Sequence, residues 1–291
     1  MQRPTITQAM IDAYDEYTHL TLDRRAFMEK LTRLAGSGAA AAAIAPMLAA
    51  SPAAAATVAE DDARITGEDI VWAGAEGEIK GYLARPAGVA DRLGAVIVIH
   101  ENRGLNGHIR DVTRRIALEG FLALAPDFLS PLGGTPEDED EARQMFSQLD
   151  PEETAANGVS TVNFLEFHQA SNGLVGAVGF CWGGAAVNQL AVATPALAAG
   201  VAYYGRQPEV EDVPQIRAAL LLHYAGLDER VNAGIEAYRE ALEAAGKEFT
   251  IHVYDGAQHA FNNDTSEARY NKEAAELAWE RTITFFREKL A

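Results

Sequence analysis

The stretch Leu174-Val-Gly-Ala-Val-Gly-Phe-Cys181-Trp-Gly-Gly-Ala-Ala186 decides the fold. A continuous apolar run passes through a glycine-flanked turn into a segment with helical character, which is typical of a buried parallel strand followed by a helix. Cys181 lies in the turn and is the single cysteine among the 291 residues. The sequence therefore excludes an internal disulfide framework and a metal site built from several cysteines.

The same alternation of strands and helices extends over the chain from residue 66 onward. The pattern predicts strands at 70–72, 78–84, 95–100, 122–125, 174–179, 199–204, 218–224 and 249–254. It predicts helices at 106–118, 138–148, 152–169, 183–193, 231–245 and 266–289. Strands that alternate with helices indicate an α/β fold, a doubly wound and mostly parallel sheet in one domain over residues 60–291.

Composition and charge exclude several classes of function. Apolar residues make up 48% of the chain and charged residues 23%, which is ordinary for a globular protein. The net charge of −18 disfavours nucleic acid and anionic membrane surfaces as partners. The chain has no H-E-x-x-H, EF-hand, P-loop or helix-opening G-x-G-x-x-G pattern, so we expect neither a metal nor a nucleotide cofactor.

Residues 1–59 differ from the rest of the chain. Arg24-Arg25-Ala-Phe27 resembles a twin-arginine export signal, and 14 of the 26 residues at 34–59 are alanine, with A-x-A-like cleavage points at 53–59. Gly and Pro interrupt this stretch, so stable membrane insertion is not expected. The first hypothesis is export to the periplasm. The alternative is a cytoplasmic protein with a helical arm on the body or on a second subunit of a dimer, as the spacing of Ile11, Tyr14, Tyr17 and Leu20 indicates.

Gly179-Phe-Cys181-Trp-Gly183 fits the nucleophile-elbow pattern G-x-nucleophile-x-G, with cysteine in place of serine. The two glycines allow the strand and helix to approach closely around a strained turn. The sulfur would then lie at a helix N-terminus, where the partial positive charge favours the thiolate. The backbone N–H of Trp182 could face a developing oxyanion. The alternative is a small buried cysteine in a glycine-rich packing turn.

A cysteine nucleophile needs a base and an acid that orients the base. His259 lies in a loop after the last predicted strand, where such a sheet presents residues at its C-terminal edge. His252 lies inside that strand and is predicted to be structural. Asp228 follows the strand at 218–224 and is the candidate acid, although it could also only cap the next helix. Glu229 is the weaker candidate.

The order Cys181, Asp228, His259, together with Gly-Phe-Cys-Trp-Gly-Gly and His-Glu-Asn-Arg-Gly at 100–104, resembles the dienelactone hydrolase family over residues 66–289. The resemblance implies an α/β-hydrolase fold and opening of enol-lactone or ester bonds by a Cys-His-Asp triad without a cofactor. It further implies that Glu101 contacts the resting thiol and that the N–H of Asn102 is the second oxyanion donor. A salt bridge at a strand end is the alternative for Glu101.

One departure from the family pattern concerns the substrate. Family members that act on dienelactone carry an arginine four residues after the catalytic histidine, and this chain has Asn263 there. Arg103 or Arg206 could supply the missing charge at the substrate site, or each could be a surface charge. The expected partner is a small ester or lactone. A thioesterase or promiscuous carboxylesterase, and a non-catalytic exported binding protein, are the competing hypotheses.

Overall fold

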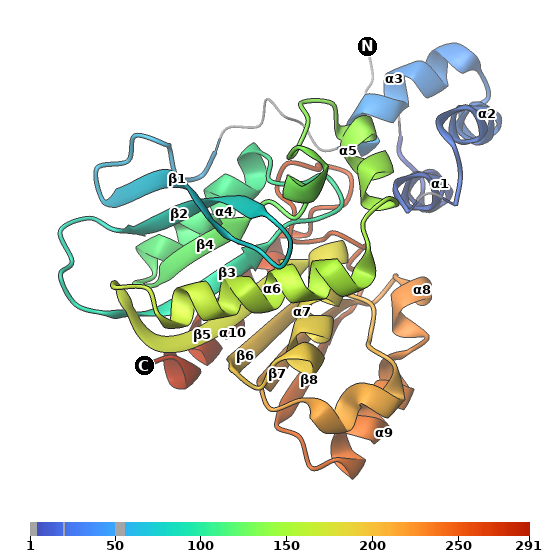
Figure 1. Ribbon diagram of the computed structural model, residues 1–291. Coiled ribbons are helices and arrows are strands. Elements are labelled where there is room, and N and C mark those ends of the chain that lie inside the picture. The colour runs from blue at the N-terminus through green and yellow to red at the C-terminus, as the bar shows by residue number, and fades with distance from the viewer. Residues whose placement is uncertain (1–4, 20, 50–55) are drawn as a thin grey trace.

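The computed structural model describes residues 5–19, 21–49 and 56–291. Its centre is an eight-stranded sheet with the strand order β1-β2-β4-β3-β5-β6-β7-β8 (Figure 1). The first two strands pair antiparallel with their neighbours, and the remaining pairs are parallel. The strands are β1 (Ile65–Ala73), β2 (Glu78–Pro86), β3 (Leu93–Ile99), β4 (Leu122–Pro126), β5 (Ser171–Phe180), β6 (Leu197–Tyr203), β7 (Ala219–Ala225) and β8 (Phe249–Tyr254).

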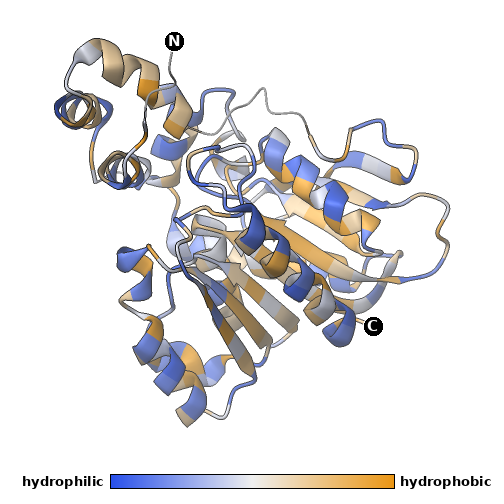
Figure 2. Ribbon diagram, turned by 180° about the vertical axis from the view of Figure 1, so that it is seen from behind, coloured by the Kyte–Doolittle hydropathy of each residue, from blue (hydrophilic) through white to orange (hydrophobic). Residues whose placement is uncertain are grey.

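Helices cover both faces of this sheet, so the predicted α/β class with a mostly parallel sheet is confirmed. One hydrophobic core joins the sheet to α6 (Pro151–Glu166), α7 (Trp182–Ala193) and α9 (Ile235–Ala244). The other joins the opposite face to α4 (Gly107–Leu118) and α10 (Lys272–Lys289). Figure 2 shows the consequence, with apolar residues along the strands and hydrophilic residues on the outer helix surfaces. Residues 95–99 of β3 are almost fully buried because both faces are covered.

Two of the predicted helices differ from those in the structure. The helix predicted at 231–245 is divided into α8 (Glu229–Asn232) and α9. The Asn232 amide donates to the Ala225 carbonyl at 2.8 Å, which ties this turn back to β7. The helix predicted at 266–289 begins only at Lys272, where the Asn271 side chain caps it by accepting from the Ala274 N–H. The preceding residues instead form turns whose backbone bonds shape the loop after β8.

The N-terminal segment contains three helices, α1 (Gln8–Thr18), α2 (Arg24–Ala35) and α3 (Gly38–Leu48), which share a small core of their own. Leu20 and residues 53–55 of the expected cleavage region lie outside the described residues. Within the described part of the chain, no single helix is long and apolar enough to cross a membrane. The pair α2 and α3 meets the length and composition required for a span, but it is bent by 112°.

The remaining short elements lie between the strands and the longer helices. They are α5 (Glu139–Phe146), within the predicted acidic excursion, and two 3-10 turns, η1 (Ser130–Leu132) and η2 (Val210–Gln215). In Figure 1, α1 and α5 lie side by side, and a hydrogen bond of 2.7 Å from the Tyr17 hydroxyl to the Asp140 carboxylate joins them. The N-terminal helices therefore pack beside the edge at which a parallel sheet presents its functional loops.

Candidate active site

Cys181 lies in a strained turn between β5 and α7. Its φ is +55° and its ψ −112°, a conformation that a residue with a side chain rarely adopts. A Cβ on Gly183 would lie 2.4 Å from the Ile99 carbonyl oxygen, and one on Gly179 would lie 2.1 Å from the carbonyl oxygen of Gly183. Both glycines are therefore required by close backbone approaches, as a nucleophile elbow demands.

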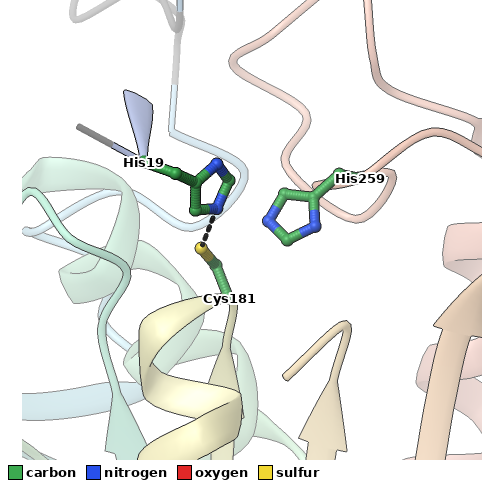
Figure 3. A group of neighbouring side chains, drawn as sticks. All are labelled: His19, Cys181 and His259. Carbon is green, nitrogen blue, oxygen red and sulfur yellow. Dashed lines mark hydrogen bonds between the residues drawn. The ribbon is translucent and has the colours of Figure 1, made fainter. Parts of the chain in front are cut away.

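The loop after β8 and the turn after β7 bring His259 and Asp228 together. His259 Nδ1 lies 2.5 Å from Asp228 Oδ2, and both side chains are buried. Asp228 also accepts from the Val231 N–H and so caps α8, which means that the two predicted roles of this carboxylate coexist. Because Nδ1 is bound to the carboxylate, Nε2 of His259 is free to face the sulfur. Figure 3 shows the His259 ring beside the Cys181 side chain.

The electrostatics of Cys181 and His259 are linked. Burial alone would raise the pKa of the thiol, but the positive charge of His259 and the hydrogen bond between Sγ and His19 lower this pKa to about 6. Burial likewise opposes a charge on His259, but the charges of Cys181 and Asp228 raise its pKa to about 10. At neutral pH the two groups therefore form a thiolate–imidazolium pair, in which the thiol is already ionised.

Glu101 is buried beside this pair, at the end of β3. Its Oε2 accepts a hydrogen bond of 2.9 Å from the Asn263 amide. Burial would raise the pKa of Glu101, but the charges of Arg103 and other nearby cations lower it, so the group is a carboxylate. The expected contact between Glu101 and the resting thiol is not among the hydrogen bonds of the described residues. Asn263 thus holds Glu101, and its contact with the substrate stays a prediction.

The two expected oxyanion donors come from adjoining backbone segments. Trp182 is the first residue of α7, where backbone N–H groups have no partner within the helix. Gly183 packs against the carbonyl of His100, which places the loop of residues 100–104 against the start of α7. Asn102 belongs to this loop, and its side-chain amide donates to the Thr18 carbonyl at 2.6 Å. The side chain of Asn102 is thereby fixed by the N-terminal helix α1.

The two arginines expected near the substrate have different positions. Arg103 is buried, donates to the Tyr14 hydroxyl at 2.6 Å and pairs with Glu139 at 3.3 Å. Arg206 is not brought to the site, because its side chain is 75% exposed and lies 3.7 Å from Glu209. The loop position of Arg206 predicted the correct edge of the sheet but not the direction of its side chain.

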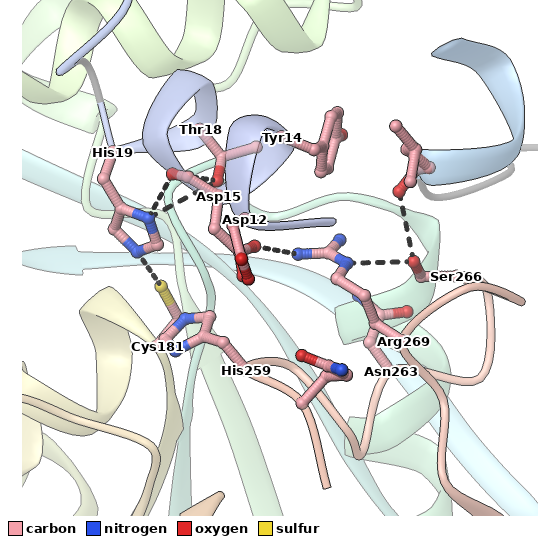
Figure 4. A network of polar contacts seen from close by, with 12 residues as sticks. Asp12, Tyr14, Asp15, Thr18, His19, Cys181, His259, Asn263, Ser266 and Arg269 are labelled. Atoms are coloured by element: carbon pink, nitrogen blue, oxygen red, sulfur yellow. Dashed lines mark hydrogen bonds and ion pairs between the residues drawn. The ribbon is translucent and has the colours of Figure 1, made fainter. Parts of the chain in front are cut away.

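Sequence reasoning missed a third arginine. Arg269 is buried near Glu101, where its charge contributes to the low pKa of that carboxylate. Its guanidinium donates to Ser266 and pairs with Asp15 at 3.3 Å (Figure 4). The sequence gives no sign of this role, because residue 269 falls in a stretch whose spacing predicts an ordinary surface helix.

The sequence also gives no sign that the end of α1 reaches Cys181. His19, immediately after α1, places Nε2 3.6 Å from Cys181 Sγ and its ring edge-on to His259 (Figures 3 and 4). Between α1 and the loops after β7 and β8 lies a cavity of about 810 Å³. Its lining is Gln8, Asp12, Asp15, Glu16, His19, Thr21, residues 226–230 and His259. The cavity therefore leads to His259 and has more carboxylates than cations in its walls.

Comparisons with known proteins match most of the chain outside the N-terminal helices. Residues 79–290 match the profile of the dienelactone hydrolase family. A putative carboxymethylenebutenolidase of Saccharolobus solfataricus is 33% identical over 246 residues, covering 72% of this chain and 94% of the relative. One of Escherichia coli K12 is 34% identical over 223 residues, covering 71% and 81%. The crystal structure of a putative dienelactone hydrolase from Klebsiella pneumoniae superposes with a TM-score of 0.70 at 29% identity, covering 77% of this chain and 98% of that one.

Proposed function

Because the chain belongs to the dienelactone hydrolase family, we propose that it opens a lactone or ester bond with Cys181 as nucleophile, His259 as base and acid, and Asp228 as the group that orients His259. The observation that carries the proposal is the strained elbow at Cys181 beside a buried His–Asp pair. A binding protein gains nothing from such backbone strain, whereas a nucleophile does.

The proposed reaction has two halves. The Cys181 thiolate attacks the carbonyl carbon, and the oxyanion that forms is stabilised by the N–H groups of Trp182 and Asn102. The tetrahedral intermediate collapses to a thioester, and the His259 imidazolium donates its proton to the departing alkoxide or enolate oxygen. Neutral His259 then takes a proton from water, which attacks the thioester. Collapse of the second intermediate releases the acid and restores the thiolate–imidazolium pair.

The charges around the cavity favour an uncharged substrate over a carboxylated one. Five carboxylates line the cavity against Arg230 and the His259 imidazolium, and Lys30 and Arg269 pair with two of these carboxylates, so one carboxylate is in excess. A substrate carboxylate would therefore enter a field of its own sign. Asn263 supplies a neutral amide that is already bound to Glu101. We infer that short neutral esters and lactones are turned over better than dienelactone.

Nitrophenol release from a nitrophenyl ester tests the proposal. A thioester intermediate predicts a burst of about one equivalent per chain when its hydrolysis is slow. Cys181→Ala should abolish turnover, and Cys181→Ser should keep a trace because the elbow and the oxyanion donors remain. Unchanged turnover in the alanine variant would remove the mechanism, and no turnover in the wild type would favour the binding protein. A thioester substrate of the same acyl group distinguishes a thioesterase.

We further propose that the chain is exported through the twin-arginine route. Arg24 and Arg25 are exposed in the first turn of α2, where a receptor could reach both side chains. Fusion of residues 1–59 to a reporter that matures only through this route should export the reporter, and Arg24→Lys with Arg25→Lys should stop it. Continued export of the double variant would overturn the proposal. N-terminal sequencing of the cell's own protein shows whether α1 remains attached.

A further inference from the structure

Three potential metal ligands from distant parts of the chain meet at the elbow. His19 follows α1, Cys181 begins α7 and His259 lies in the loop after β8. The sulfur and one nitrogen of each ring lie within 4.8 Å of one another (Figure 3). The proposed hydrolytic mechanism uses two of these groups for bond making and proton transfer, and assigns neither step to the third, His19.

We propose that His19, Cys181 and His259 form a binding site for a thiophilic divalent cation, with Zn²⁺ as the type, which exists only while α1 is attached to the catalytic domain. Zinc bonds to sulfur at about 2.3 Å and to imidazole nitrogen at about 2.0–2.1 Å, so tetrahedral geometry separates sulfur and nitrogen by about 3.6 Å. Cys181 Sγ and His19 Nε2 are 3.6 Å apart. The other two separations among the three ligand atoms are at most 4.8 Å, and they would shorten by up to about 1 Å when the ion binds.

The outer partners of both imidazoles turn their Nε2 atoms toward the sulfur. The Asp15 carbonyl can only accept, so its 2.6 Å contact assigns the proton of His19 to Nδ1. His259 donates in the same way from Nδ1 to Asp228. Carboxylate and carbonyl partners of this kind are the usual outer shell of zinc-bound histidines. His259 Nε2 is buried and has no hydrogen-bond partner among the described residues, so an ion can replace the proton that this nitrogen carries in the imidazolium.

The ligand set determines which ion fits and what binding does. Thiolate and imidazole select Zn²⁺ over Mg²⁺ and Ca²⁺, which prefer oxygen ligands. The acid-lined cavity beside the site attracts cations. A bound ion would occupy the electron pairs that the nucleophile and the base need, and so would reversibly silence hydrolysis. Removal of residues 1–59 during export would remove His19 and release the enzyme from this control.

Among the described residues, Arg230 competes with an ion for the Nε2 atom of His19. Its guanidinium, which can only donate, lies 2.9 Å from His19 Nε2. The side chain of Arg230 is exposed, so it can move away when an ion binds. Its positive charge nonetheless opposes a cation at this position. Arg230→Ala should therefore strengthen metal binding, which no general loss of structure would do.

The test is titration of the metal-free full chain with Zn²⁺ by calorimetry and with Co²⁺ by absorption spectroscopy. We expect one ion per chain, with a thiolate-to-cobalt charge-transfer band and the visible bands of tetrahedral cobalt. Loss of an outer-shell partner weakens zinc sites about 10–100-fold, so His19→Ala, which removes a ligand, should weaken binding by about 100-fold or more. His168→Ala is the matched control. It removes a half-buried imidazole that precedes β5, at the opposite end of that strand from Cys181, and should leave affinity unchanged.

Two results would overturn the proposal. Equal Zn²⁺ affinity in wild type and His19→Ala would show that α1 supplies no ligand. A cobalt spectrum without the thiolate band would place the ion away from Cys181. Since both titrations are done without substrate, they do not depend on the proposed hydrolase activity, and neither result bears on the triad.

Discussion

Replacing His259 with glutamine separates the two roles that the structure gives this residue. In the wild type, His259 holds the pKa of the Cys181 thiol at about 6, against an ordinary value of 9.0. At about pH 7 the thiolate fraction is then about nine-tenths, and it falls to about one-hundredth if the pKa returns to its ordinary value. Ionisation alone therefore predicts a loss of about 100-fold in kcat/KM. The missing proton donor for the leaving group adds to this loss.

The assay measures ionisation and turnover separately. The rate of alkylation of Cys181 by iodoacetamide as a function of pH reports the thiolate, and ester hydrolysis reports the whole reaction. In His259→Gln the alkylation midpoint should move from about 6 toward 9, and hydrolysis should partly recover as the pH rises through that range. His252→Gln is the matched control, because His252 stacks on His223 in the sheet and should alter stability more than rate.

An alkylation midpoint that stays near 6 in His259→Gln would refute the reasoning. It would mean that His19, whose hydrogen bond also lowers the thiol pKa, is sufficient to ionise Cys181. If His252→Gln lost activity and His259→Gln did not, the assignment of the base would be wrong.

Three further predictions concern pH, packing and substrate charge. For the wild type, kcat/KM should rise through about pH 6 as Cys181 ionises and fall above about pH 10 as His259 loses its proton, so a pH profile without the lower limb would contradict the ion pair. Gly183→Ala should lower the free energy of unfolding by about 3 kcal/mol or more, because the added Cβ would lie 2.4 Å from the Ile99 carbonyl oxygen and 2.5 Å from that of His100. Urea unfolding measures this, with Gly107→Ala, where the added Cβ meets nothing within 4 Å, as the control. The ratio of kcat/KM for a carboxylated lactone to that for its methyl ester should be below one, and Asn263→Arg should shift it toward the acid by about tenfold, or 1.4 kcal/mol. A wild-type ratio well above one would show that another cation receives the carboxylate, and Arg103→Ala would then test Arg103.

The sequence predicts the sheet and the positions of the triad because their signals are local. An apolar run, a pair of glycines and a loop after the last strand each indicate a place at the same edge of the sheet. The sequence predicts a start of α10 that is too early. Residues 261–271 form turn hydrogen bonds, although the spacing of their apolar residues is compatible with a continuous helix. Such competition between local and tertiary bonding has no signature in a single sequence.

The contacts of α1 could not be predicted for a different reason. His19 and Cys181 are 162 residues apart, and nothing near His19 indicates which surface the helix covers. Arg269, one of the two arginines whose charge acts on Glu101, illustrates the same limit. Arg103 and Arg206 both follow predicted strands, yet Arg269, from a stretch with no such signal, is the one that lies buried with Asp15.

The central claim is that Cys181 becomes covalently acylated during turnover. Acid quenching within the burst of a nitrophenyl ester, followed by mass spectrometry of the digested chain, tests this claim most directly. We predict that the peptide containing Cys181 gains the mass of the acyl group, that the adduct disappears as turnover ends, and that Asp228→Asn, which weakens His259 as a base, prolongs its lifetime. Turnover without any adduct on Cys181, or an adduct on another residue, would contradict the account.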